Sequence, residues 1–123
     1  MKKIIVLFTI LFLISCKEES KKESLYPEIA KTPIELGKEI FEGKGNCFAC
    51  HQATQKVIGP SIQDIAKIYK EKNGDIVSFL KEDAKPIVDP SQYDVMKTNF
   101  TITKEMSDEE LKVIEAYILS QAK

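Results

Sequence analysis

Two cysteines and the single histidine of the chain stand together in the run Cys47-Phe48-Ala49-Cys50-His51. The C-x-x-C-H pattern is the attachment motif for haem c. Its two thiols add to the two vinyl groups of a porphyrin, and the two intervening residues set the thiols apart by the distance between these vinyls. The next residue then points under the iron, so His51 is expected to be the proximal ligand. The motif predicts one covalently attached haem c, held through Cys47 and Cys50.

Other interpretations of this motif are weaker. A thioredoxin-like redox pair would need a βαβ context, and the sequence shows none. A structural zinc site needs four ligands, whereas the chain offers one histidine and, apart from Cys16, two cysteines. Chance placement of two of the three cysteines at these offsets from the only histidine is rare for this composition, so the residues favour haem.

The first residues have the pattern of an export signal. Lys2 and Lys3 precede the apolar run 4–14, which is short for a transmembrane helix and typical of a signal peptide. The run ends before Ser15-Cys16, which resembles a bacterial lipobox. We therefore expect a signal peptide over residues 1–15 and a lipid on Cys16; the alternative is an ordinary signal peptide with an incidental cysteine.

A charged stretch follows Cys16, with the sequence KEESKKES. Because it has few apolar residues to bury, we expect residues 16–31 to form a flexible polar tether. The folded domain is then expected over residues 32–123. This organisation predicts an exported protein, in the periplasmic space or at the cell surface, anchored to a membrane through lipidated Cys16.

Length and charge indicate one small domain. The chain has 123 residues and a formal net charge of −1, and all its basic residues are lysines. There is no basic block, so nucleic acid is not expected as a partner. We expect a monomer.

Capping signals and apolar periodicity predict helices over 33–42, 61–69, 75–82 and 107–121. Thr32 with Glu35 and Ser107 with Glu110 have the capping-box pattern, and Pro86 and Pro90 mark an irregular segment. No run alternates like a strand. The expected fold is all-α, a bundle of four to five short helices wrapped around one haem. The side chains expected to face inward are Ile34, Leu36, Ile40, Phe41, Ile62, Ile65, Ala66, Ile68, Tyr69, Ile76, Phe79, Leu80, Leu111, Ile114, Tyr117 and Ile118.

The order of these parts resembles the class I cytochrome c family. The resemblance covers residues 33–121 and comprises Gly37-x-x-x-Phe41, the haem motif, Ile58-Gly59-Pro60, a loop methionine, and a last helix with Tyr117-Ile118. It implies that the first helix crosses the last, with Gly37 permitting close approach and Phe41 and Tyr117 near the crossing. It also implies that the Pro60 carbonyl accepts a hydrogen bond from the His51 ring.

Two methionines could be the distal iron ligand. Met106 precedes the expected cap Ser107 and lies at the position of a hydrophobic staple, which pairs with Leu111. Met96 lies in the irregular stretch between helices, and Met96-Lys97-Thr98-Asn99 resembles the methionine loop of the family. We expect Met96 to be the distal ligand, with Met106 as the alternative.

Two axial ligands would leave no open position on the iron, so we expect an electron carrier and no enzymatic activity. Its expected partners are redox proteins, a donor complex and a terminal oxidase or reductase. Two alternatives are an accessory haem subunit of one such complex and a five-coordinate haem protein that binds gas or peroxide. Lysines expected near the haem could steer an acidic partner, or could simply be solvated: Lys44, Lys56, Lys85 and Lys97.

Overall fold

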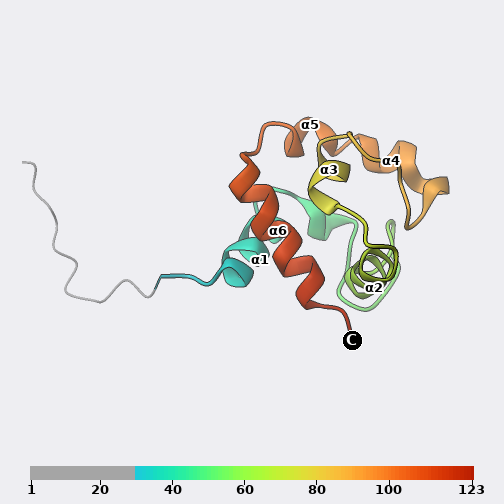
Figure 1. Cartoon of the computed structure of the whole chain (residues 1–123). Coiled ribbons are helices and arrows are strands. Elements are labelled where there is room, and N and C mark those ends of the chain that lie inside the picture. Colours follow the sequence, from blue (N-terminus) through green and yellow to red (C-terminus); the bar gives the residue numbers. More distant parts are fainter. Residues whose placement is uncertain (1–29) are drawn as a thin grey trace, which may run out of the picture.

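The computed structural model describes residues 30–123, and this part of the chain is helical without any strand (Figure 1). The all-α prediction is therefore confirmed, although six α-helices form where four to five were expected. In chain order the elements are α1 (Pro33–Glu42), the 3₁₀ turn η1 (Cys47–Ala49), α2 (Ile62–Lys72), α3 (Ile76–Leu80), the 3₁₀ turn η2 (Pro90–Gln92), α4 (Tyr93–Lys97), α5 (Phe100–Thr103) and α6 (Asp108–Ser120).

The first and last helices cross, as the resemblance implied, and Figure 1 shows α6 lying across α1. The crossing is close because Gly37 has no side chain: a Cβ placed on it would lie 1.8 Å from the carbonyl oxygen of Val113. Beside the crossing, the rings of Phe41 and Tyr117 meet edge to face, with centroids 5.4 Å apart. This contact joins the two ends of the described chain.

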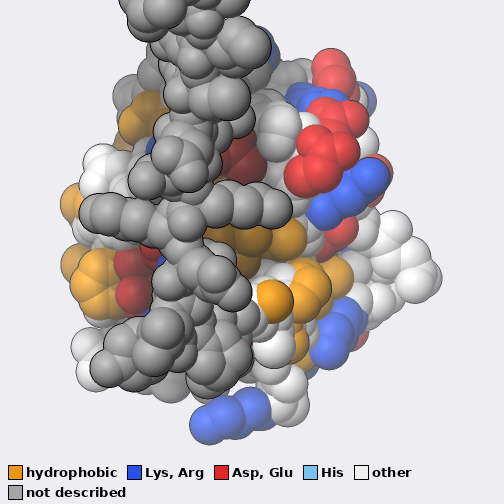
Figure 2. Space-filling model, turned by 90° about the vertical axis from the view of Figure 1, so that its left-hand side faces the viewer, with side chains coloured by type: hydrophobic (Ala, Val, Ile, Leu, Met, Phe, Trp, Pro, Cys, Tyr) orange, Lys and Arg blue, Asp and Glu red, His pale blue; other side chains and the backbone are white. Residues whose placement is uncertain are grey.

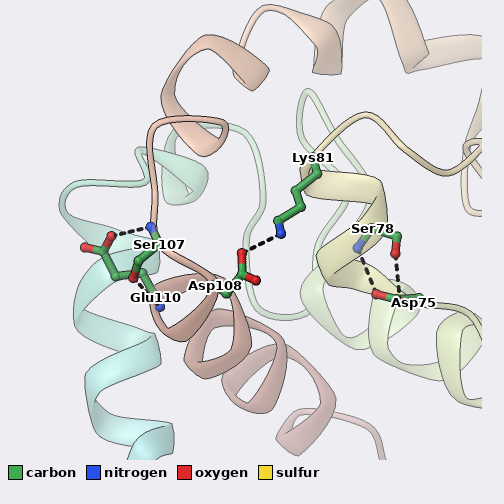
Figure 3. A network of polar contacts seen from close by, with 6 residues as sticks. All are labelled: Asp75, Ser78, Lys81, Ser107, Asp108 and Glu110. Atoms are coloured by element: carbon green, nitrogen blue, oxygen red, sulfur yellow. Dashed lines mark hydrogen bonds and ion pairs between the residues drawn. The ribbon is translucent and has the colours of Figure 1, made fainter.

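The expected caps start the longer helices. Thr32 with Glu35 and Ser107 with Glu110 form complete capping boxes at α1 and α6. The cap of α3 is also made by a side chain, that of Asp75. Figure 3 shows the caps of α3 and α6 together with the ion pair between Lys81 and Asp108, which ties the end of α3 to the start of α6.

Most side chains expected to face inward are buried, including all four named on α6. Ile34 and Leu36 are exceptions, with 45% and 39% of their surfaces exposed, and their expected burial is wrong. The reason is that α1 packs mainly on α6 and η1, so it buries only the narrow face with Gly37, Ile40 and Phe41. Apolar periodicity could not reveal how narrow this face is. Ile65, Ile68 and Phe79 are half-buried.

The segment after Pro86, expected to be irregular, contains η2, α4 and α5. These helices have at most five residues and no side-chain caps, so neither periodicity nor a capping pattern reveals them. The segment is held to α3 by aromatic contacts, because the ring of Phe79 lies 6.2 Å from that of Tyr93 and 5.4 Å from that of Phe100. The buried hydroxyl of Thr103 also donates to the carbonyl of Leu80, at 2.6 Å.

Residues 30–123 contain no helix with the length and apolarity needed to cross a membrane. The expected signal peptide, the lipobox at Cys16 and nearly all of the expected tether lie outside the described residues.

Candidate haem site

A largely apolar cavity opens between α2, α3, α4 and α6. Its apolar wall includes Tyr69, Phe79, Ile114 and Ile118. Four side chains that the sequence analysis assigned to haem attachment or iron ligation line this one cavity: Cys47, Cys50, His51 and Met96. The fold therefore brings together a motif and a methionine that are 45 residues apart in the sequence.

A tight turn presents the two cysteines and the histidine. Asn46 takes a left-handed conformation (φ 51°) and directs the chain into η1. The backbone N–H groups of Cys50 and His51 then both donate to the carbonyl of Cys47, at 3.1 and 3.0 Å. The C-x-x-C-H run is thus wound into a single turn, and its three functional side chains reach the same cavity.

The ring of His51 is fixed from two sides. Its Nδ1 lies 2.8 Å from the carbonyl oxygen of Pro60, the contact that the resemblance implied. Since a carbonyl only accepts, Nδ1 carries the proton and leaves Nε2 free as a ligand. Gly59 lies against the ring, and a Cβ placed on it would be 2.5 Å from Cε1 of His51. This close packing of Gly59 was not predicted from the sequence.

Burial keeps the His51 ring neutral, as iron ligation requires. Desolvation lowers its pKa, while the hydrogen bond to Pro60 acts in the opposite direction. Burial also raises the pKa of the Cys47 thiol to about 11. This burial places Cys47 Sγ against the apolar lining of the cavity and away from water. Residues 30–123 contain no cluster of three or more His, Cys, Asp or Glu side chains arranged to hold a metal ion.

The two candidate methionines occupy different environments. Met96 is half-buried on α4 and lines the cavity, although it lies in a short helix and not in the irregular stretch expected. Met106 does not line this cavity. It is 6% exposed and lies just before the cap of α6, four residues ahead of Glu110, where the staple pattern pairs it with the buried Leu111. The fold thus gives Met106 a core position.

Some features of the site were not predicted. Ile87 and Val88, from the proline-marked segment, line the cavity, and their only sequence signal is a pair of apolar residues between Pro86 and Pro90. The Asn99 side chain donates to the carbonyl of Gly45 at 3.1 Å. This hydrogen bond connects the loop after α4 to the chain just before the haem motif.

The lysines expected near the haem are mostly paired with acids. Lys44 lies 2.6 Å from Glu110, Lys56 lies 2.8 Å from Asp89, and Lys97 lies 3.7 Å from Glu82. Figure 2 likewise shows lysine and acidic side chains side by side at the edge of one face. These pairs favour the simpler interpretation of a solvated, charge-balanced surface over a cluster that steers an acidic partner.

Comparison with known proteins decides the family. Residues 34–122 match the family described as Cytochrome c. The chain belongs to the cytochrome c family. This class I c-type cytochrome is 49% identical over 37 residues to cytochrome c-552 of Nitrosomonas europaea, which covers 30% of the chain and 35% of that relative. It is also 49% identical over 43 residues to cytochrome c2 of Rubrivivax gelatinosus. This matched segment makes up 35% of the chain and 45% of that relative. The matched segments thus span less than half of either relative.

Members of the cytochrome c family are electron carriers that bind haem c covalently, and the residues of this site fit that group. Two thiols at the C-x-x-C spacing and a histidine with a free Nε2 line an apolar cavity. Gly59 leaves the space that the histidine ring occupies. As a member of this family the cytochrome binds haem c covalently, and the residues that line this cavity would hold it.

Proposed function

We propose that this cytochrome is a single-electron carrier whose haem is held by Cys47 and Cys50 and ligated by His51 and Met96. One observation carries the proposal: these four side chains, and not Met106, line the same apolar cavity. With both axial positions taken by protein side chains, no position would be open to substrate, which supports electron transfer over catalysis.

The chain's own residues would set the properties of the site. Haem c, when bound, supplies one-electron exchange between ferric and ferrous iron. Pro60 holds the His51 ring in one tautomer through the 2.8 Å hydrogen bond. The thioether of Met96 would favour the ferrous state and so raise the potential. The apolar wall of the cavity limits the access of water to the haem. This also favours the ferrous haem, which carries less charge than the ferric haem.

A redox titration combined with carbon monoxide binding tests this proposal. The haem-loaded protein should titrate reversibly with one electron, and its ferrous form should bind carbon monoxide slowly, because Met96 must first leave. Met96→Ala should bind carbon monoxide much faster. Fast binding by the unaltered protein would instead favour a five-coordinate haem that binds gas or peroxide.

We also propose that the cytochrome is exported and held at a membrane by a lipid on Cys16. The support lies in the sequence: a short apolar run follows Lys2 and Lys3 and ends at the lipobox-like Ser15-Cys16. In cells fed labelled palmitate, the unaltered protein should carry the label and Cys16→Ala should not. An unaltered protein without label would contradict the lipid anchor.

The proposed partners are redox proteins, a donor complex on one side and a terminal oxidase or reductase on the other. The charge-balanced lysines near the cavity support brief contacts with more than one partner over a single strong electrostatic complex. Affinity purification after mild detergent extraction tests this choice. Stoichiometric recovery of one oxidase or reductase would show an accessory subunit instead.

A further inference from the structure

Three non-glycine residues of the described part have a left-handed backbone: Asn46, Asn73 and Glu82, with φ of 51°, 49° and 65°. Asparagine tolerates this conformation well, whereas other residues with a long side chain do so at a cost. Glu82 is therefore the outlier. A residue kept in an unfavourable conformation points to a role for its side chain.

The backbone around Glu82 does not require a glutamate. The N–H of Glu82 donates to the carbonyl of Phe79 at 3.0 Å, and the N–H of Asp83 donates to that of Ser78 at 2.8 Å. These two bonds form a Schellman motif that ends α3, with Glu82 at the position where glycine is usual. Glycine would suit this turn better, so the backbone alone does not account for a glutamate at position 82.

The carboxylate of Glu82 lies between two lysines of the segment that carries Met96. Its Oε2 accepts a hydrogen bond from Lys104 Nζ at 2.5 Å, and its Oε1 lies 3.7 Å from Lys97 Nζ. The hydrogen bond from Lys104, with smaller contributions from Lys97, holds the pKa of Glu82 below its usual range, so the group stays ionised. Lys97 Nζ also lies 5.4 Å from the centroid of the Tyr93 ring.

The helix that carries Met96 needs such a contact. None of the residues of α4 is fully buried. Met96 packs half-buried against the core, whereas α5 is anchored by the buried Phe100 and Thr103. The contact of Tyr93 with Phe79 attaches α4 to α3, and the ion pair of Lys97 with Glu82 attaches it to the turn after α3. Lys104, just after α5, pairs with the same Glu82 carboxylate and so attaches the other end of the segment that carries Met96.

We propose that Glu82 is a positioning residue: its carboxylate holds residues 93–104 against the end of α3 and so keeps Met96 in the cavity. This inference rests on the proposed ligation by Met96. The ligand would then leave the iron more often when the carboxylate or its main partner, Lys104, is removed.

Imidazole binding to the ferric, haem-loaded full chain tests the inference, because imidazole can enter only while Met96 is away from the iron. In stopped-flow experiments, Glu82→Gly and Lys104→Gln should each bind imidazole about two- to fivefold faster than the unaltered protein, the effect of losing an exposed ion pair. Glu82→Gly should at the same time be as resistant to denaturant or more so, since glycine suits the turn. A purely structural role of Glu82 would not move these two readouts in opposite directions.

Lys81→Gln is the matched control. It removes an ion pair from the same end of α3, but this pair reaches Asp108 on α6 and not the segment of Met96. Its imidazole rate should equal that of the unaltered protein. Unchanged rates in Glu82→Gly and Lys104→Gln, or an equal acceleration in Lys81→Gln, would overturn the inference.

A further variant, Met96→Ala, separates this inference from the proposed function. If Met96→Ala binds imidazole much faster while the Glu82 and Lys104 variants do not, the ligand is correct and the positioning role is wrong. If Met96→Ala binds imidazole no faster than the unaltered protein, the proposed ligation itself fails.

Discussion

Replacing Gly37 by alanine should destabilise the protein, because α1 and α6 cross at this residue. The added Cβ would lie 1.8 Å from the carbonyl oxygen of Val113 and 2.9 Å from Cβ of Tyr117. An ordinary carbon–oxygen contact is at least about 3.3 Å, so the helices must separate by roughly 1.5 Å and loosen the packing of Phe41 on Tyr117. Overpacking typically costs about 1–3 kcal/mol. Because the clash is with backbone, we expect the upper end of this range, which exceeds the gain of about 1 kcal/mol from the higher helix propensity of alanine.

Denaturant unfolding of the haem-loaded protein measures this cost. The neighbouring exposed Lys38 provides the control, because Lys38→Ala and Lys38→Gly compare the same two residue types in α1 away from the crossing. The Lys38→Ala protein should be more stable than the Lys38→Gly protein by about 1 kcal/mol. At position 37 the order should reverse, so that Gly37→Ala is less stable than the unaltered protein. If alanine stabilises both positions equally, the close crossing is refuted.

Three further changes test other parts of the structure. Thr103→Val leaves a buried backbone carbonyl of α3 without its donor and should lower the free energy of unfolding by about 1–3 kcal/mol, whereas Thr101→Val, at an exposed site, should have little effect in the same denaturant titration. The lowered pKa of Glu110 means that its contribution to stability is complete above about pH 4.5 and is lost as the pH falls further. Glu110→Gln should therefore be less stable at neutral pH, and its stability should fall less steeply below pH 4.5 in acid titrations; a parallel loss in both proteins would contradict this. Gly59→Ala would press a methyl group onto the His51 ring; it should cost about 1–3 kcal/mol and change the absorption spectrum, and an unchanged spectrum would count against the packing described.

The sequence predicted the parts of the fold that depend on short-range chemistry. Thr32 and Ser107 were recognised as helix caps because a capping box places its two partners three residues apart. The attachment motif was recognised for the same reason, since its spacing matches the haem vinyl groups. The long helix α6 was predicted with its buried face because its apolar residues recur over more than three turns.

What the sequence could not predict depends on contacts between distant segments. Ile34 and Leu36 are exposed because only α6 and η1 pack extensively on α1. Helical periodicity shows which residues share a face, but not which other elements pack on that face. The helices α4 and α5 are too short for a periodic pattern and lack side-chain caps. The left-handed backbone of Glu82 was also unforeseen, because a glutamate gives no turn signal.

The absorption spectrum of the ferric, haem-loaded protein tests the central claim most directly, when recorded beside Met96→Ala and Met106→Ala. Ligation by His51 and Met96 predicts a weak absorption band at the red end of the visible spectrum, typical of sulfur bound to ferric iron. Met96→Ala should abolish this band and Met106→Ala should retain it. Loss of the band in Met106→Ala alone would move the ligand to Met106. Absence of the band from the unaltered protein would contradict methionine ligation, and with it the proposed electron carrier with two protein ligands.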